Sequence, residues 1–164
     1  MNIVFFILLG VELLIVAYLD LKYKKISNLW SLLNLALFPI LLFLLPNLYV
    51  LDWSLLIFPL GFIVIGFILF LMDIMGAGDS KYLASLFLLI PLDRQFLYFE
   101  KLVQVTLIVG ALLLMKTVIK NMGKIKAYFV SHHWRGFKDL IRSRFSYAPV
   151  MFLAWLLLGM GEWL

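Results

Sequence analysis

The sequence has 164 residues, of which 65% are hydrophobic and only 14% are charged. A soluble domain is about half apolar and about a quarter charged, and a chain of this size has too little interior to hide the excess. The mean hydropathy of +1.09 therefore excludes a soluble domain and makes lipid the solvent for much of the surface. The absence of cysteine excludes disulfides, thiolate nucleophiles and cysteine-based zinc sites.

Six hydrophobic runs predict an all-α, polytopic integral membrane protein with about six transmembrane helices. Five of them approach, at about 1.5 Å per residue, the roughly 30 Å thickness of a hydrocarbon core. The fourth is short even when counted from Asp79 to Pro91, so we expect it to begin inside the membrane boundary or in a water-filled cavity between other helices. The runs cover residues 2–19, 29–45, 55–72, 82–91, 102–119 and 147–164.

The basic residues predict the orientation of these helices. Most of the fourteen Lys and Arg follow the first, third and fifth runs, and few lie in the alternate connections. The positive-inside rule places the basic connections in the cytoplasm, so both ends of the chain are expected on the outer side. The first run has no basic flank before it and no small-residue cleavage site after it, which argues against a signal peptide.

The sequence predicts a single membrane-embedded domain over residues 1–164, because no repeat, linker or low-complexity tract divides it. Its one sizeable polar stretch, residues 120–146, is a basic loop expected in the cytoplasm. Apolar side chains are scattered among its cations, which suits a helix lying on anionic lipid headgroups; a solvated basic loop is the alternative. The net charge of +5 indicates contact with anionic lipid and helps to set the orientation in the membrane. Nucleic acid is not an expected partner.

Three aspartates are expected at the inner membrane face: Asp20 at the end of the first span, Asp73, and Asp79 at the start of the fourth. Two carboxylates from different helices suit aspartyl hydrolysis, in which one takes a proton from water while the other, protonated, polarises the scissile carbonyl. Such a pair shares one proton and titrates as a unit. An ordinary interfacial carboxylate at the end of a span is the alternative reading of each.

Asp79 stands in the segment Gly76-Ala77-Gly78-Asp79, directly before a predicted helix. The two glycines are expected to allow backbone angles that other residues avoid and to leave room for a substrate strand beside the carboxylate. The alternative is an ordinary turn with an aspartate N-cap. Lys81 is expected either to steady the local charge or to extend toward the cytoplasm.

Three segments, in order along the chain, resemble the motifs of the type IV prepilin peptidases, the bacterial members of the G-x-G-D aspartyl membrane proteases. Residues 20–28 are similar to the family's D-x-K/R-x-x-x-I-P-N segment, with Lys22 and Asn28 at two of its positions. Residues 76–81 resemble the second motif, G-x-G-D followed by an aliphatic residue and lysine. Residues 147–151 resemble the aromatic-small-proline opening of the family's last helix.

The resemblance implies an activity, a substrate and a location. Members of the family cleave the short basic leader of prepilins and pseudopilins at the cytoplasmic face of the bacterial plasma membrane, without a cofactor. Asp20 and Asp79 take the positions of their two catalytic aspartates. The residues then expected to shape the site are Gly76, Gly78, Lys81, Lys22 and Asn28.

The chain departs from the family pattern in two positions and in length. Ser27 stands where the family usually has proline, and Ser80 where it usually has an aliphatic residue. Ser27, with Asn28, is expected to cap the second span in place of proline. The additional cysteine-bearing segment of larger relatives is missing, so the chain resembles the short members of Flp or tight-adherence pilus systems, and methyltransferase activity is not expected.

Other polar residues have plainer interpretations. Glu12 is expected to be a hydrogen-bonded group that orients helices, or else to face the same cavity as Asp20. Asp73 lacks flanking glycines and is interpreted as a cap or water-contacting group. The adjacent histidines 132 and 133 are expected on the surface of the basic loop, because neighbouring residues of a helix point in different directions, and no metal site is predicted. The expected interhelical hydrogen bonders are Asn34, Gln104 and Thr106.

Two other classes of function compete with the peptidase. A non-enzymatic ion or proton carrier would use Asp20, Asp79 and Glu12 as a relay through the membrane, and a catalytically silent factor would serve pilus assembly. A relay predicts polar groups at several depths, whereas most of the candidate acids gather at one face. The sequence therefore favours the peptidase.

Overall fold

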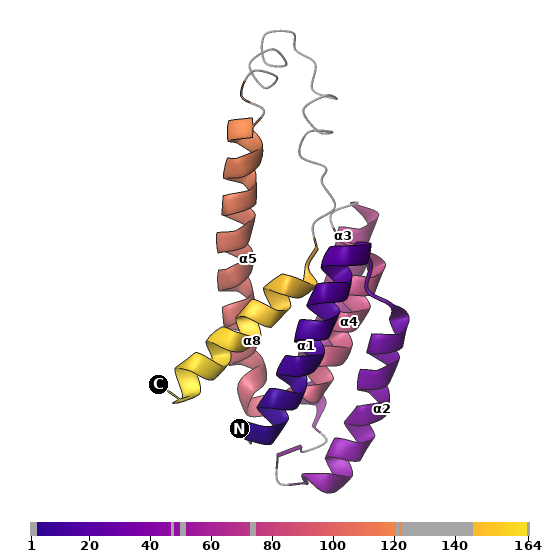
Figure 1. Ribbon diagram of the computed structural model, residues 1–164. Coiled ribbons are helices and arrows are strands. Elements are labelled where there is room, and N and C mark those ends of the chain that lie inside the picture. The colour runs from indigo at the N-terminus through magenta and orange to yellow at the C-terminus, as the bar shows by residue number, and fades with distance from the viewer. Residues whose placement is uncertain are drawn as a thin grey trace.

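The computed structural model describes residues 3–46, 48–49, 52–72, 75–120, 122 and 146–163, and within them every regular element is a helix (Figure 1). Each predicted hydrophobic run overlaps one α-helix of the described residues, which confirms the all-α class. A short 3₁₀ helix, η1, leads directly into α3. The elements are α1 (Ile3–Tyr23), α2 (Asn28–Leu44), η1 (Trp53–Leu56), α3 (Ile57–Leu71), α4 (Ala77–Leu89), α5 (Leu92–Lys120) and α8 (Ala148–Trp163).

In the part of the chain that the structure describes, three helical segments are long and apolar enough to cross a membrane: Ile3–Tyr23, Trp53–Leu71 and Leu92–Lys120. Two further apolar helices, α2 and α8, are shorter. In the most apolar stretch of α5 only 11% of the residues are buried, and in that of η1 and α3 only 17%. Leucine, isoleucine and phenylalanine side chains at this density on an outer surface require lipid as their solvent, so the chain is a membrane protein.

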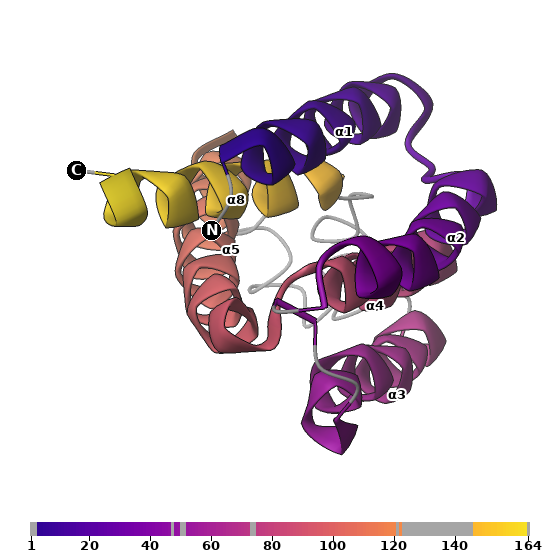
Figure 2. The ribbon, with the colours of Figure 1, turned by 90° about the horizontal axis from the view of Figure 1, so that it is seen from below.

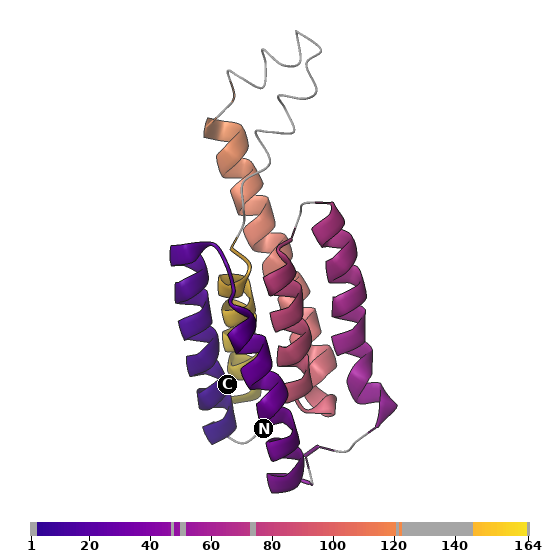
Figure 3. The same cartoon turned by 90° about the vertical axis from the view of Figure 1, so that its right-hand side faces the viewer.

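The short helix α4 lies at the centre of the bundle (Figures 2 and 3). It packs against α2 on one side and α3 on the other, and α8 packs against α1 and α5. Every residue of α4 from Asp79 to Leu89 is buried except Lys81. As the sequence predicts, the helix begins at the G-x-G-D segment and has only 13 residues. Enclosure by other helices explains how so short a helix is accommodated without exposing its backbone to lipid.

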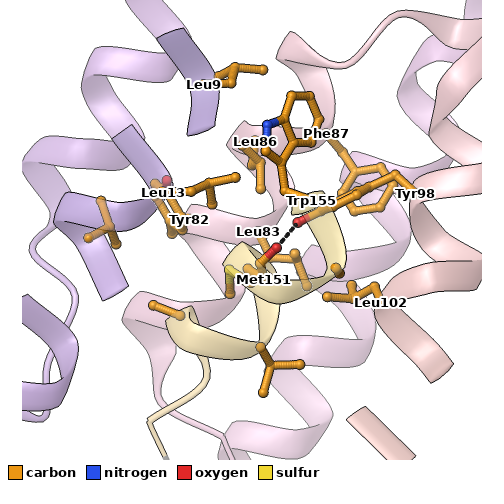
Figure 4. Close-up of a cluster of buried hydrophobic side chains, with 14 of the residues drawn as sticks. Leu9, Leu13, Tyr82, Leu83, Leu86, Phe87, Tyr98, Leu102, Met151 and Trp155 are labelled. Atoms are coloured by element: carbon orange, nitrogen blue, oxygen red, sulfur yellow. Dashed lines mark hydrogen bonds between the residues drawn. The ribbon is translucent and has the colours of Figure 1, made fainter. Parts of the chain in front are cut away.

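The core joins α1, α4, α5 and α8 through large side chains (Figure 4). Phe87 of α4 packs against Tyr98 of α5, and Tyr98 in turn meets the ring of Trp155 edge to face. The Tyr98 hydroxyl donates to the carbonyl of Met151 on α8 at 3.1 Å, so the polar end of this buried ring is satisfied. This cluster fixes α8 against the α4–α5 pair.

Helix α5 begins at Leu92 rather than near Leu102, where its apolar run starts. Charged and amide side chains lower the hydropathy of the first three turns. The buried positions of α5 nevertheless follow a helical spacing. The backbone N–H groups of Arg94 and Gln95 donate to the Pro91 carbonyl at 2.9 and 3.1 Å. The buried residues of the helix are Gln95, Tyr98, Leu102 and Val105.

Gln95 closes the C-terminal end of α4. Its side-chain nitrogen donates to the carbonyls of Phe87 at 2.8 Å and Ile90 at 3.2 Å, and the Tyr49 hydroxyl donates to the carbonyl of Leu89. The last carbonyls of a helix have no partner within it, so protein donors replace water at this buried end.

The contact between α3 and α4 is closest at Gly66, where a Cβ atom would lie 2.3 Å from Oγ and 2.4 Å from Cβ of Ser80. A small residue at position 80 therefore fits this helix crossing, where an aliphatic side chain is usual in the resembled family. We expect Gly66→Ala to lower the free energy of unfolding by about 1–3 kcal/mol, because the two helices must separate.

Gly61 on the same helix provides the matched control, since a Cβ there meets nothing within 4 Å. Gly61→Ala should leave stability unchanged or raise it by up to about 1 kcal/mol. Thermal unfolding of both variants in detergent measures the difference. Equal stability of the two variants would contradict the close packing of α3 on α4.

Candidate active site

Asp20 lies in the last turn of α1, where its side chain is buried with 3% exposure. Its Oδ2 accepts the backbone N–H of Ala148, the first residue of α8, at 3.2 Å. Its carbonyl accepts a hydrogen bond from the hydroxyl of Ser146 at 3.3 Å. The unpaired N–H groups of a helix N-terminus favour negative charge, so the start of α8 holds and stabilises this carboxylate.

Lys24 ends α1 in the left-handed region, with a φ of 53°. Its N–H bonds to the Asp20 carbonyl at 2.8 Å, and this turn directs its ammonium group to the hydroxyl of Ser146 at 2.9 Å. The ammonium charge of Lys24 favours the ionised form of Asp20. The turn after α1 and the residue before α8 are thereby tied together beside the carboxylate.

Asp79 lies in the first turn of α4, and its side chain is buried with 8% exposure. Gly76 is the N-cap of the helix, and its N–H donates to Oδ2 of Asp79 at 3.2 Å. Asp79 is therefore the third residue of the helix, and the alternative of an aspartate N-cap is wrong. Both aspartates accept a backbone N–H at the N-terminal end of a helix.

The structure corrects the reason for the two glycines. None of the described glycines has a positive φ, and Gly76 has an ordinary φ of −73°, so unusual backbone angles are not required. A Cβ on Gly78 would lie 2.6 Å from the carbonyl oxygen of Ile26. The space that Gly78 leaves is occupied by the chain's own backbone rather than left open for a substrate strand. The glycine permits the turn after α1 to pack directly on the start of α4.

Asp20 and Asp79 are brought together by this packing, at the end of the bundle where α1 ends and α4 and α8 begin (Figure 1). The charge of Asp20 acts on Asp79, and Asp79 in turn acts on Tyr147, which precedes α8. Repulsion between two buried carboxylates disfavours the doubly ionised state. A pair that carries one proton has both an ionised oxygen that can take a proton and a protonated oxygen that can give one.

The other residues expected to shape the site have exposed side chains. Lys22, Asn28 and Lys81 are exposed, and the ammonium of Lys22 stands 5.1 Å from the centre of the Tyr23 ring. Each lysine follows its aspartate by two positions, which places it on another face of the helix. Their part in shaping the site stays a prediction. The cap on α2 is confirmed, because Ser27 is its N-cap and accepts the N–H of Leu29 at 3.3 Å.

Glu12 takes part in a hydrogen-bonded cluster between three helices. The Tyr82 hydroxyl of α4 donates to its Oε1 at 3.0 Å, and the fully buried Asn34 of α2, with its amide nitrogen turned toward Glu12, donates to the same oxygen at 2.9 Å. The opposite amide atom of Asn34 lies 3.4 Å from the Ser85 hydroxyl. These bonds confirm Asn34 as an interhelical group and support the helix-orienting interpretation of Glu12.

We expect Glu12→Gln to retain most of the stability, because its carbonyl oxygen still accepts from Tyr82 and Asn34. Glu12→Leu leaves both buried donors without this acceptor and should lower the free energy of unfolding by about 1–3 kcal/mol. Thermal unfolding of the two variants in detergent compares them. An ion carrier that relays protons through Glu12 would instead lose transport with the glutamine variant, since an amide does not titrate.

The other two expected interhelical groups differ in outcome. The hydroxyls of Thr106 on α5 and Tyr147 lie 2.9 Å apart, which links α5 to the residue before α8. Gln104 instead donates to Glu100 at 2.8 Å on its own helix, so the interhelical prediction for it is wrong. Gln104 points outward from α5, where its own helix supplies the nearest acceptor.

Several predictions fall outside the described residues: Asp73, the histidines at 132 and 133, and nearly all of the basic loop 120–146. In the part of the chain that is described, no three His, Asp or Glu side chains are placed to hold a metal ion. Sequence reasoning noted Tyr147 only as part of a helix opening and gave no role to Ser146. The available sequence signal was the position of Ser146 and Tyr147 directly before Ala148. The backbone N–H of Ala148 donates to the Asp20 carboxylate.

Comparison of the chain with protein-family models, curated proteins and solved structures finds no match.

Proposed function

We propose that the protein is an aspartyl endopeptidase of the bacterial plasma membrane that removes the short basic leader of Flp-like type IV prepilins and pseudopilins. The observation that carries the proposal is the buried pair Asp20 and Asp79, which comes from two helices and meets at one end of the bundle. The resemblance of residues 20–28 and 76–81 to the motifs of prepilin peptidases assigns the substrate class.

In the proposed reaction the ionised carboxylate takes a proton from a water molecule, and the water oxygen attacks the scissile carbonyl. The protonated carboxyl group gives its proton to the carbonyl oxygen, which forms a tetrahedral diol. The first carboxyl group then passes the water proton to the amide nitrogen while the second takes back a hydroxyl proton of the diol, so the C–N bond breaks and the amine of the mature pilin leaves. No covalent enzyme intermediate forms, and each carboxyl group ends in the protonation state in which it began. The N–H groups of Ala148 and Gly76 stabilise whichever carboxylate is charged.

The proposal includes six spans with both ends of the chain outside and the pair near the cytoplasmic face. A prepilin has a basic leader in the cytoplasm followed by an apolar helix, so the scissile bond lies at the inner membrane boundary. The short α4 supports this arrangement, because a helix of 13 residues can place Asp79, in its first turn, below the level of the headgroups.

The test is co-expression of the protein with a prepilin whose leader carries an N-terminal tag. The tag should be released by the wild type, and N-terminal sequencing of the product should place the cut between the basic leader and the apolar helix. The double variant Asp20→Asn/Asp79→Asn, inserted to the same level, controls for peptidases of the host. Retention of the tag by the wild type would overturn the proposal.

The carrier remains the second candidate because Glu12, Tyr82 and Asn34 place polar groups at another depth of the bundle. Reconstitution of the wild type into vesicles separates the two functions. Proton or cation flux without leader cleavage would favour the carrier. Pilus assembly that depends on the protein, with neither cleavage nor flux, would favour the silent assembly factor.

A further inference from the structure

Lys24 occupies a backbone conformation that usually belongs to glycine. Among the residues that the structure describes, it alone has a positive φ, of 53°. Its N–H donates to the carbonyl of Asp20, four residues earlier, which is the hydrogen bond of a helix that ends in the left-handed region. Glycine adopts this conformation without strain, whereas lysine does not. A lysine at this position therefore points to a use for its side chain.

The Lys24 side chain is linked to the start of α8 through Ser146. Its ammonium group donates to the Ser146 hydroxyl oxygen at 2.9 Å, across 122 residues of sequence. An ammonium group can only donate, so the single proton of the Ser146 hydroxyl is left for the carbonyl of Asp20, 3.3 Å away. Ser146 is buried with 7% exposure. The exposed lysine is therefore anchored on a buried hydroxyl that is itself bonded to α1.

The segment that contains Ser146 also provides a hydrogen bond to the Asp20 carboxylate. The N–H of Ala148, two residues further on, donates to Oδ2 of Asp20 at 3.2 Å. Pro149 has no N–H, and the N–H groups of the two residues after it donate to the Tyr147 carbonyl. Of the first four residues of α8, Ala148 is therefore the one whose N–H is available to the carboxylate.

We propose that Lys24 and Ser146 are positioning residues, which hold the start of α8 against the end of α1 and so keep the Asp20 carboxylate in its place in the acid pair. Two hydrogen bonds reach the Asp20 carbonyl, from the Lys24 N–H and the Ser146 hydroxyl, and a third reaches the carboxylate from Ala148. The inference rests on the proposed peptidase function. It adds to the site two residues that the resembled motifs leave unspecified.

The test compares leader cleavage by purified variants in lipid nanodiscs, with a prepilin as substrate. Lys24→Gly removes the ammonium group and keeps the left-handed turn, which glycine favours. If the lysine served only the fold, this variant would cleave at the wild-type rate. We expect instead a loss of roughly tenfold in kcat with little change in KM, because Asp20 moves relative to Asp79. Lys24→Arg, whose guanidinium group can also donate to Ser146, should restore most of the rate.

Ser146→Ala removes the other half of the bridge and should lower kcat by about the same factor. Because both residues act through one contact, the double variant Lys24→Gly/Ser146→Ala should lose no more than the larger single loss. Multiplied losses would show that the two residues act independently and would overturn the inference.

Lys25→Gly is the matched control, because it removes the same charge from the next, exposed position of the turn. This variant should keep the wild-type kcat. An equal loss in Lys25→Gly and Lys24→Gly would assign the effect to the charge of the turn rather than to the bridge, and would overturn the inference.

Amide hydrogen exchange, measured by mass spectrometry, gives a readout that does not depend on activity. Peptides that cover the start of α8 should exchange faster in Lys24→Gly than in the wild type, and at the wild-type rate in Lys25→Gly. Wild-type cleavage by Lys24→Gly, with or without faster exchange, would overturn the inference and leave the peptidase function standing. Absence of cleavage by the wild type would overturn both.

Discussion

Replacement of either Asp20 or Asp79 by asparagine is expected to reduce leader cleavage by roughly 10³-fold or more, since proton transfer in each direction needs a carboxyl group. Asparagine has the same size, and its side-chain oxygen can still accept the N–H of Ala148 at position 20 or that of Gly76 at position 79. The fold should therefore survive either change. The loss should appear in kcat with little change in KM, because neither carboxylate is proposed to bind the leader.

The matched control is Asp93→Asn. Asp93 lies in the first turn of α5, as Asp79 lies in the first turn of α4, but its side chain is 65% exposed and pairs with the adjacent Arg94. This variant should cleave at the rate of the wild type. Cleavage by Asp20→Asn or Asp79→Asn within tenfold of the wild-type rate, with the protein correctly inserted, would exclude the acid pair.

The second large effect is expected at Gly78. In Gly78→Ala the new Cβ would stand 2.6 Å from the backbone oxygen of Ile26, which cannot rotate away as a flexible side chain would. The turn after α1, which follows the helical turn of Asp20, and the start of α4, which carries Asp79, must then separate. A displacement of about 1 Å in a reacting group can cost 10²-fold in rate, and overpacking should lower the free energy of unfolding by about 1–3 kcal/mol.

Gly110→Ala on α5 controls for the change from glycine to alanine in a membrane helix, because a Cβ there meets nothing within 4 Å. Cleavage assays and thermal unfolding of the two variants, measured side by side, give the comparison. Wild-type activity and stability of Gly78→Ala would show that the contact between Gly78 and Ile26 does not position the pair.

Hydrophobic runs and start signals predict most of the fold. They locate the helices and the short fourth helix, because apolar length and the Gly76–Asp79 segment are local properties of the chain. The early start of α5 escapes prediction, since Gln95 becomes buried only through the carbonyls that end α4. A polar residue that hydrogen-bonds to the end of another helix leaves no pattern in the sequence around it.

The candidate site is predictable in its two aspartates and not in the contacts that support them. The link from Lys24 to Ser146 and the bond between Thr106 and Tyr147 join residues remote in sequence, so neither has a spacing to detect. The motif singles out Gly78, but the reason that a glycine is needed there is the Ile26 carbonyl that packs against it. Motifs identify the candidate groups, and tertiary packing determines how those groups are held.

The C-terminal end of α4 finds its hydrogen-bond partners inside the protein, through Gln95 and Tyr49, and at the other end Asp79 accepts the N–H of Gly76. The C-terminal end needs neither water nor headgroups, so the bilayer does not dictate where this helix stops. Its 13 residues span about 20 Å, which is shorter than a hydrocarbon core. A thicker or thinner membrane would tilt the outer helices and leave the distance from Asp79 to the opposite end of α4 unchanged. The distance between the Asp79 carboxylate and the opposite end of α4 is therefore set by the length of the helix and not by the thickness of the membrane.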